Sequence, residues 1–323
     1  MFQLRFDLRV PPFADITHVQ QYREALDMCE WADTRGFFGV TISEHHGTED
    51  GFISSPLTLA AAILSRTDNL LCSVAALLLP YHDPIRVAED IATIDLISPG
   101  RLVVIAGIGY REFEFDMFAK DRSTRGASTE AAIELMRRCW TGEPFEHEGR
   151  TVWVTPKPVT EPHPMLMVGG SVEASARRAA RLGLPFQPAI DDPALIELYY
   201  AEAEAAGHDS AFAVMPSGPG MVLVTEDPER TWATIGPNCL YDAGVYAGWQ
   251  HDDQRSIWKV DATDIDGLKA SGQWAIVTPD ECVDLYREVG HAVMHPLVGG
   301  IDPAIGWESL QLVVDKVMPA LEG

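Results

Sequence analysis

The sequence predicts an α/β protein of the (β/α)8 (TIM) barrel class, folded as a single domain over residues 1–323. Two observations support this class. Short apolar segments alternate with segments of helical spacing, and the alternation gives eight strand–helix units. The turn at 9–12, after the first apolar segment, has no glycine fingerprint. A doubly wound dinucleotide-binding sheet would need that fingerprint, so the open-sheet alternative is disfavoured.

The first half of the chain supplies four of these units. A helix after the first strand carries apolar residues at helical spacing and stops before Gly36. Asp83 and Pro84 are an N-cap and a first-turn proline, so a helix begins there. The expected strands lie at 3–9, 37–43, 70–79 and 101–106, and the helices lie around 19–29, at 56–65, from 84 and at 129–141.

The second half repeats the rhythm with one interruption. Gly183 and Gly207 follow two of its helices, and Thr278-Pro279 opens another. The stretch at about 236–275 contains several tryptophans and many aspartates, and we expect it to be an insertion between strands 7 and 8. Its tryptophans are Trp249, Trp258 and Trp274. The expected strands lie at 165–168, 184–189, 220–224 and 292–298, and the helices lie at 172–182, 193–206, from 228, from 279 and at 305–321.

Composition excludes several classes of partner. The net charge of −24 argues against nucleic acid and anionic membranes as partners. No apolar run approaches the roughly 20 residues of a membrane helix, and residues 1–5 lack a signal-peptide pattern. The five cysteines form no Cys-x-x-Cys pair, which favours buried free thiols and a cytoplasmic location.

The strand at 37–43 ends in three consecutive ionisable residues, Glu44, His45 and His46. The carboxyl end of a strand is where α/β enzymes place their chemistry, so these residues are candidate catalytic groups. Successive strand residues point to opposite faces, so a regular strand would direct only one histidine toward a given pocket. The other would then be structural. The same alternation disfavours a metal site made from all three, and we expect no metal.

Glycines mark two further strand ends as candidate ligand sites. Gly107, Gly109 and Arg111 follow one strand, and an arginine beside glycines suits a phosphate or carboxylate. The alternative is a bulge at the barrel rim. Gly169, Gly170 and Ser171 open a helix that also contains Ser175. Backbone N–H groups at such a helix start favour phosphate, with plain helix capping as the alternative. Small residues at Ala75 and Ala76 would let a flat ligand approach, or would simply pack in the core.

These motifs together resemble the luciferase-like flavin monooxygenases, and the resemblance covers nearly the whole chain. The order and spacing of the motifs are more specific than any one of them. The matching motifs are Glu44-His45-His46, Ala75-Ala76 with Pro80, Asp83-Pro84, Ala88-Glu89-Asp90 with Asp95, Gly100-Arg101-Leu102, Gly109-Tyr110-Arg111 through Glu114-Phe115, Gly183-Leu184-Pro185 and Thr278-Pro279-Asp280-Glu281-Cys282.

The resemblance implies a barrel mouth that binds reduced FMN, which reacts with O₂ while the protein excludes water and orients a small organic substrate. It implies that His45 exchanges a proton, that Ala75–Ala76 is a cis peptide beneath the flavin ring, and that the Gly170–Ser175 segment binds the phosphate. It also implies a homodimer and a separate flavin reductase as partner.

The chain departs from the luciferases at the phosphate site. Ile108 stands where they carry an arginine, and Ser171 and Val172 stand where they carry an acid–hydroxyl pair. These departures put light emission and the choice of cofactor in doubt. Three functions therefore stay open: an FMN monooxygenase, an oxidoreductase that transfers hydride with the deazaflavin F420 and without O₂, and a non-catalytic flavin-binding relative.

Overall fold

The computed structural model describes residues 1–250, 256–257 and 259–322; Trp258 lies outside them. The chain forms two compact units. Unit 1 comprises 1–41, 45–54 and 216–323, and unit 2 comprises 42–44 and 55–215. Each unit contains strands and helices of the expected barrel, and the single domain over 1–323 stays a prediction.

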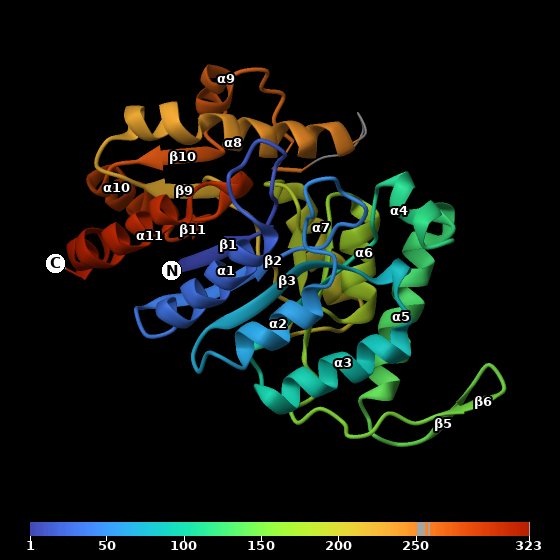
Figure 1. Ribbon diagram of the computed structural model, residues 1–323. Helices are drawn as coiled ribbons and strands as arrows, with labels where there is room; N and C mark the ends of the chain where they lie inside the picture. Colours follow the sequence, from blue (N-terminus) through green and yellow to red (C-terminus); the bar gives the residue numbers. More distant parts are fainter. Residues whose placement is uncertain (251–255, 258, 323) are drawn as a thin grey trace. The chain divides into compact units, whose positions relative to one another are not determined.

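Unit 1 contains parallel strands in the order β10-β9-β11-β1-β2 (Figure 1). Phe2 lies opposite Ala292, and Trp274 lies opposite Met221. The strands are β1 (Phe2–Phe6), β2 (Phe37–Ile42), β9 (Met221–Val224), β10 (Trp274–Val277) and β11 (Ala292–Met294). The helices are α1 (His18–Ala32), α8 (Pro228–Trp249), α9 (Ile265–Ala270), α10 (Pro279–Val289), α11 (Pro303–Leu312) and α12 (Met318–Glu322).

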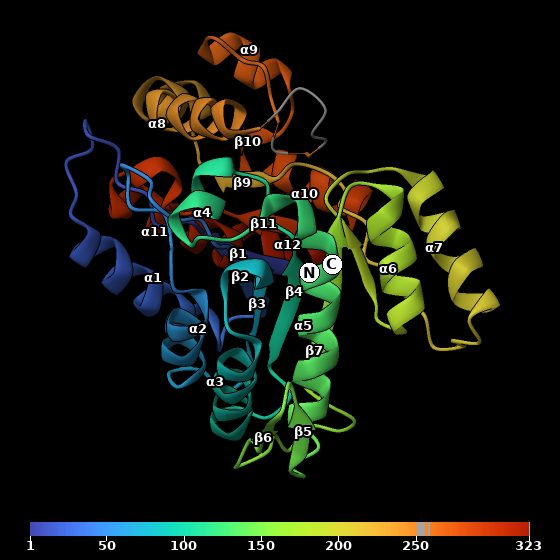
Figure 2. The same ribbon diagram turned by 90° about the vertical axis from the view of Figure 1, so that its right-hand side faces the viewer.

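Unit 2 contains parallel strands in the order β3-β4-β7-β8. A short antiparallel hairpin, β5–β6, projects from the rest of this unit (Figure 2). The strands are β3 (Leu71–Leu78), β4 (Leu102–Gly107), β5 (Phe145–His147), β6 (Arg150–Val152), β7 (Met165–Gly170) and β8 (Phe186–Pro188). The helices are α2 (Pro56–Leu64), α3 (Pro84–Ile97), α4 (Glu112–Met117), α5 (Arg125–Cys139), α6 (Glu173–Leu182) and α7 (Pro193–Ala205).

The side chains expected to cap two helices form the predicted hydrogen bonds at the helix N-termini. The Asp83 carboxylate accepts hydrogen bonds from the backbone N–H groups of Ile85 (2.9 Å) and Arg86 (3.2 Å) at the start of α3. Thr278 and Glu281 form a reciprocal capping box at the start of α10. Both units therefore confirm the α/β class, and α3 and α10 begin where the sequence places them. The helix expected at 129–141 instead begins at Arg125.

Helix α8 continues through Pro237 to Trp249, so the first part of the insertion expected at about 236–275 is helical, and the bounds of the insertion stay a prediction. A proline inside a helix costs about 3 kcal/mol. The helix persists because its apolar stripe continues on both sides of Pro237 and packs into the core of unit 1. The buried residues of that stripe include Trp232, Ile235, Cys239, Ala243 and Tyr246. The chain also forms strand β10 at the end of the expected insertion.

Several strands are shorter than predicted, and the differences in β1 and β2 matter for the site. Strand β1 ends at Phe6, so Asp7 to Arg9 lie beyond it. Strand β2 ends at Ile42, so Glu44, His45 and His46 lie in irregular backbone. The strict alternation of side chains expected at the two histidines therefore does not apply.

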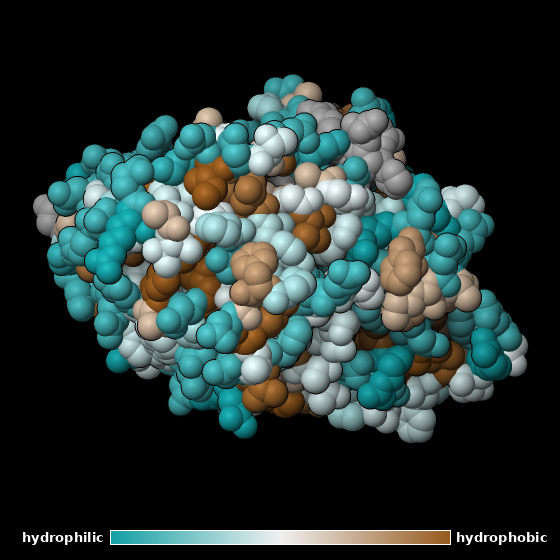
Figure 3. Space-filling model, turned by 45° about the horizontal axis from the view of Figure 1, so that its top comes forward, coloured by the Kyte–Doolittle hydropathy of each residue, from teal (hydrophilic) through white to brown (hydrophobic). Residues whose placement is uncertain are grey.

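The surface and core agree with the composition. All five cysteines are free and buried, as expected. Hydrophilic residues cover much of the face in Figure 3, with smaller hydrophobic patches among them. Within the described part of the chain, no helix is both long and apolar enough to cross a membrane.

Candidate functional site

Glu44 is a buried carboxylate in unit 2 with both oxygens engaged. The backbone N–H of Leu78 donates to its Oε2 at 2.6 Å, and His82 Nε2 lies 2.7 Å from its Oε1. Glu44 is only 1% exposed, whereas the His82 side chain is 27% exposed. The carboxylate therefore links the end of β2 to the end of β3, and it fixes a histidine that still reaches solvent.

A wall of small residues lies at the ends of β3 and β4. The Ala75–Ala76 peptide is cis, as the resemblance predicts, and both alanines are half-buried. A Cβ on Gly107 would lie 2.7 Å from the Ala76 Cβ, so only glycine fits there. A side chain at position 107 would therefore clash with β3.

Arg111 and Glu114 tie the chain after β4 to the first turn of α4. Arg111 Nη1 donates to Glu114 Oε1 at 2.8 Å, and the Tyr81 hydroxyl donates to Glu114 Oε2 at 3.2 Å. Burial, together with the Glu114 charge, raises the pKa of Tyr81, which keeps its phenol protonated. Gly109 has φ +69°, and a Cβ there would lie 2.5 Å from the Tyr81 hydroxyl. Tyr81 thus lies beside Gly109 and binds Glu114, which is also the partner of Arg111.

The turn between β7 and α6 contains the candidate phosphate residues. Gly169 lies in β7, where a Cβ would approach Ile105 Cγ2 to 2.8 Å. Gly170, the last residue of β7, lies against the Ser175 side chain. Ser175 is 2% exposed; its Oγ donates to the Val172 carbonyl at 2.7 Å and accepts from the Val172 N–H at 3.3 Å. The Ser175 hydroxyl therefore caps the helix, while Gly170 and Ser171 are partly exposed.

His45 and His46 belong to unit 1, and each is 6% exposed. The His45 backbone N–H donates to Ile53 O at 3.0 Å. The His45 ring lies in an aromatic cage that we define as Phe52, Tyr246 and Trp249, with centroid distances of 5.0, 6.2 and 4.8 Å. The two predicted histidines are thus buried together on one segment, and the cage encloses His45.

Beside this cage lies a buried charge cluster that the sequence does not reveal. Arg9 is fully buried, and its guanidinium lies 2.9 Å from Asp50, 3.3 Å from Asp242 and 3.5 Å from Asp7. His295 Nε2 lies 3.3 Å from Asp7. Buried charges of this kind persist only when they are paired. We call Arg9, Asp7, Asp50, Asp242 and His295 the Arg9 cluster.

The pKa values of two carboxyl groups in the cluster are shifted in opposite directions. Burial, and then the charge of Asp7, raises the pKa of Asp242 to about 7. Burial opposes ionisation of Asp7 too, but His295 and Arg9 outweigh it and hold the pKa of Asp7 below its usual range. Burial also lowers the pKa of His295. The cluster therefore keeps a proton on Asp242 below about pH 7, while Asp7 stays ionised.

Sequence reasoning missed His82, Arg9, Asp242 and His295 as site residues. No local motif marks them, since Arg9, Asp242 and His295 come together from three distant parts of the chain. The weak signal was Arg9 itself, an arginine directly after an apolar strand. The Glu114 carboxylate was visible only as part of the family motif around Gly109.

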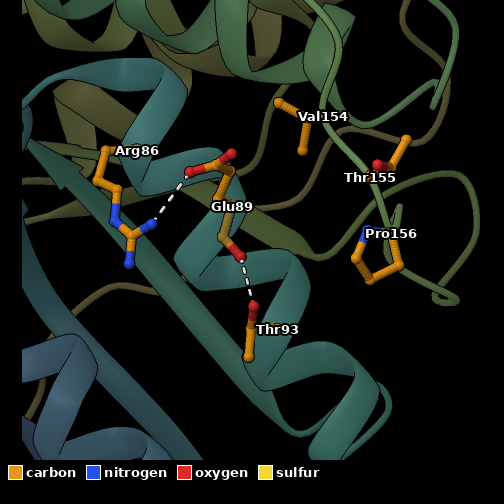
Figure 4. Close-up of a pocket in the computed structure, with 6 residues that line it drawn as sticks. All are labelled: Arg86, Glu89, Thr93, Val154, Thr155 and Pro156. Carbon is orange, nitrogen blue, oxygen red and sulfur yellow. Dashed lines mark hydrogen bonds and ion pairs between the residues drawn. The ribbon is translucent and has the colours of Figure 1, made fainter.

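Unit 2 also contains a pocket whose lining includes none of these residues. It has a volume of about 210 Å³ and lies between α3 and the chain after β6 (Figure 4). Arg86 donates to Glu89 across one turn of α3, and Thr93 donates to the Glu89 carbonyl. Its lining contains neither a strand end nor any predicted site residue, so we do not assign the cofactor there.

Comparison with known proteins places these residues in a family. A family model described as "Luciferase-like monooxygenase" matches residues 6–295. The oxygenase component of a flavin-dependent trigonelline monooxygenase from Acinetobacter baylyi is 26% identical over 163 residues. That match covers 50% of this chain and 45% of the relative, so it spans about half the length of each protein.

Solved structures match along nearly the whole chain. A monooxygenase from Streptomyces bottropensis is 24% identical with a TM-score of 0.77, and 99% of each chain is covered. The oxygenating constituent of a 3,6-diketocamphane monooxygenase from Pseudomonas putida, in complex with FMN, has a TM-score of 0.72 at 20% identity, with 98% of each chain covered. An F420-dependent secondary alcohol dehydrogenase has a TM-score of 0.71 at 18% identity, covering 99% of this chain and 98% of its own. These structures confirm the predicted fold, and the family match shows that this chain belongs to the luciferase-like monooxygenases.

Proposed function

We propose that the protein is a flavin-dependent monooxygenase that uses reduced FMN and O₂ on a small or apolar organic substrate. The family match over residues 6–295 carries this proposal. The name of the Acinetobacter baylyi relative supports it, and so does the complex of the Pseudomonas putida relative with FMN. Reduced FMN would supply the electrons that activate O₂.

The small-residue wall of unit 2 fits a flat ring. Ala75 and Ala76 keep exposed surface in a strand whose flanking residues Val74 and Leu77 are fully buried. Gly107 has no space for a side chain beside Ala76. A flat ring placed there would bury the remaining exposed surface of Ala75 and Ala76. We assign Ala75, Ala76, Gly107 and Gly109 to ring binding.

The start of α6 is the proposed phosphate site. Helix α6 has ten residues, and the N–H groups of its first turn carry a partial positive charge. Gly169, Gly170 and Ser171 lead into it, and Ser175 holds the turn in shape through Val172. Arg111 is paired with Glu114, so in this proposal it holds the loop after β4 and leaves the phosphate to α6.

His45 is the proposed proton-transfer residue, with Glu44 and His46 in supporting roles. An imidazole gains and loses a proton near neutral pH, and the aromatic cage around His45 keeps water away from its ring. Glu44 orients His82 and the end of β3. We further propose a cytoplasmic homodimer served by a separate flavin reductase, which the "oxygenase component" name of the relative supports.

The test is a fluorescence titration of the purified protein with FMN, riboflavin and F420, followed by O₂ uptake with a flavin reductase present. The proposal expects FMN to bind more tightly than riboflavin, and O₂ uptake to depend on an added organic substrate. Tight F420 binding with weak FMN binding would replace it with the F420-dependent oxidoreductase, an alternative that Ile108 in place of the family arginine keeps open. Binding without any turnover across a substrate panel would favour the non-catalytic relative.

A further inference from the structure

The Arg9 guanidinium and the His45 ring share one aromatic cage. The guanidinium carbon lies 4.8 Å from the ring centroid of Phe52, 4.5 Å from Tyr246 and 4.7 Å from Trp249. The same three rings contact the His45 ring. A cation over an aromatic face is attracted by the ring quadrupole, and the attraction grows where water is excluded. Arg9 therefore fixes the rings that His45 packs against.

The backbone joins the same two segments. Val10 N–H donates to Asp50 O at 2.8 Å, and Ile53 N–H donates to Asp7 O at 3.1 Å. Asp50, which holds the Arg9 guanidinium, and Phe52, which forms the cage, both lie on the loop that begins with His45. Helix α8 supplies the remaining cage rings and Asp242. The Arg9 side chain is thus the point at which three segments meet beside His45.

We propose that Arg9 is a positioning residue for His45: its charge orders the shared aromatic cage and disfavours protonation of the imidazole. This proposal rests on the proposed function only for the measurement of kcat, because the titration of His45 needs no enzyme activity. The ionisable groups around Arg9 are Arg5 and Asp7 from the β1 segment, Asp50 from the loop, Asp242, Tyr241 and Tyr246 from α8, and His295 after β11.

The groups around the guanidinium distinguish Arg9 from an ordinary buried ion pair. An ion pair alone would be satisfied by its carboxylates, and the rings would play no part. Here the guanidinium lies within 5 Å of three ring centroids as well as three carboxylates. A planar guanidinium stacks on aromatic faces in a way that the point charge of lysine reproduces only in part. Removing the charge and changing its shape should therefore have separable effects on His45.

The experiment follows the His45 imidazole by NMR in histidine-labelled protein, with its signal assigned by its loss in His45→Gln. Arg9→Met keeps the volume and removes the charge; Arg9→Lys keeps the charge. The proposal expects the pKa of His45 to rise by at least about 0.5 unit in Arg9→Met, because a nearby cation is lost. In Arg9→Lys it should stay within about 0.3 unit, with weaker His45–Trp249 ring contacts. An unchanged titration in a folded Arg9→Met protein would overturn the proposal.

A second variant covers the case in which Arg9→Met does not fold. Asp50→Asn removes one negative charge beside Arg9 and keeps an oxygen that accepts the hydrogen bond from Nη1. The proposal then expects the His45 pKa to fall, opposite to Arg9→Met, and an unchanged or rising value would overturn it. Once a substrate is known, Arg9→Lys should lower kcat about tenfold with little change in KM. Absence of monooxygenase activity would contradict the proposed function but not the role of Arg9, because the NMR measurements need no turnover.

Discussion

The His45 region of unit 1 and the small-residue wall of unit 2 solve different physical problems. Around His45, charges are buried: Arg9 is fully enclosed by three carboxylates and three aromatic rings. At the wall, side chains are small: Ala75 and Ala76 are half-buried, and the buried Gly107 has no room for a Cβ beside Ala76. In the proposed function, the first region holds the proton-transfer residue His45 and the second binds the flavin ring. Substitutions should therefore act on stability and turnover in the first region, and on cofactor binding in the second.

The largest expected effect comes from Arg9. Arg9→Met leaves Asp50, Asp242 and Asp7 buried without their shared cation, and breaking a buried pair costs about 3–5 kcal/mol. Urea unfolding should show a loss of unfolding free energy of this size. The matched control is Arg86→Met on α3, whose side chain is 70% exposed, and it should change stability by less than about 0.5 kcal/mol. Equal losses of unfolding free energy in Arg9→Met and Arg86→Met would show that the buried Arg9 cluster stabilises the fold no more than a surface ion pair does.

The second effect is on turnover. A positioned acid or base contributes about 10²–10⁴-fold, so His45→Ala should lower single-turnover flavin oxidation by at least about 100-fold. Cofactor affinity should stay within a few fold, because the proposed ring and phosphate contacts lie on other residues. Stopped-flow absorbance measures the step. If His46→Ala slows this step far more than His45→Ala, the roles of the two histidines are reversed.

The same two regions differ in how far the sequence predicts them. The residues proposed to bind the cofactor carry local signals: glycines after a strand, small residues in a strand and a glycine pair before a helix. Helix caps such as Asp83 are equally local and were placed correctly. The Arg9 cluster has no local signature, because tertiary contacts bring Arg9, Asp50, Asp242 and His295 together. The continuation of α8 past Pro237 was missed for the same reason, since burial outweighs a local helix-breaking signal.

The third effect depends on pH. The pKa of Asp242 is raised from 3.8 to about 7, so between these values the folded chain binds a proton that the unfolded chain has lost. This contribution to stability is full below pH 4 and is lost as the pH rises through about 7. Its slope is at most about 1.4 kcal/mol per pH unit. Asp242→Asn has no such proton, so the difference in unfolding free energy between wild type and Asp242→Asn should fall from pH 5 to pH 8. A difference that stays constant in urea titrations at these pH values would show that Asp242 is ionised in the folded protein.

The smallest effect, at Ser175, tests the unit 2 side of the comparison. Its hydroxyl caps α6 through Val172, and losing such a cap costs about 1 kcal/mol of stability. If the α6 turn binds the phosphate, Ser175→Ala should also weaken FMN binding by about tenfold and leave riboflavin binding nearly unchanged, because riboflavin has no phosphate. Fluorescence titration with both ligands separates the two contributions. Equal weakening for FMN and riboflavin would place the phosphate elsewhere, and would reduce Ser175 to a cap that stabilises the helix.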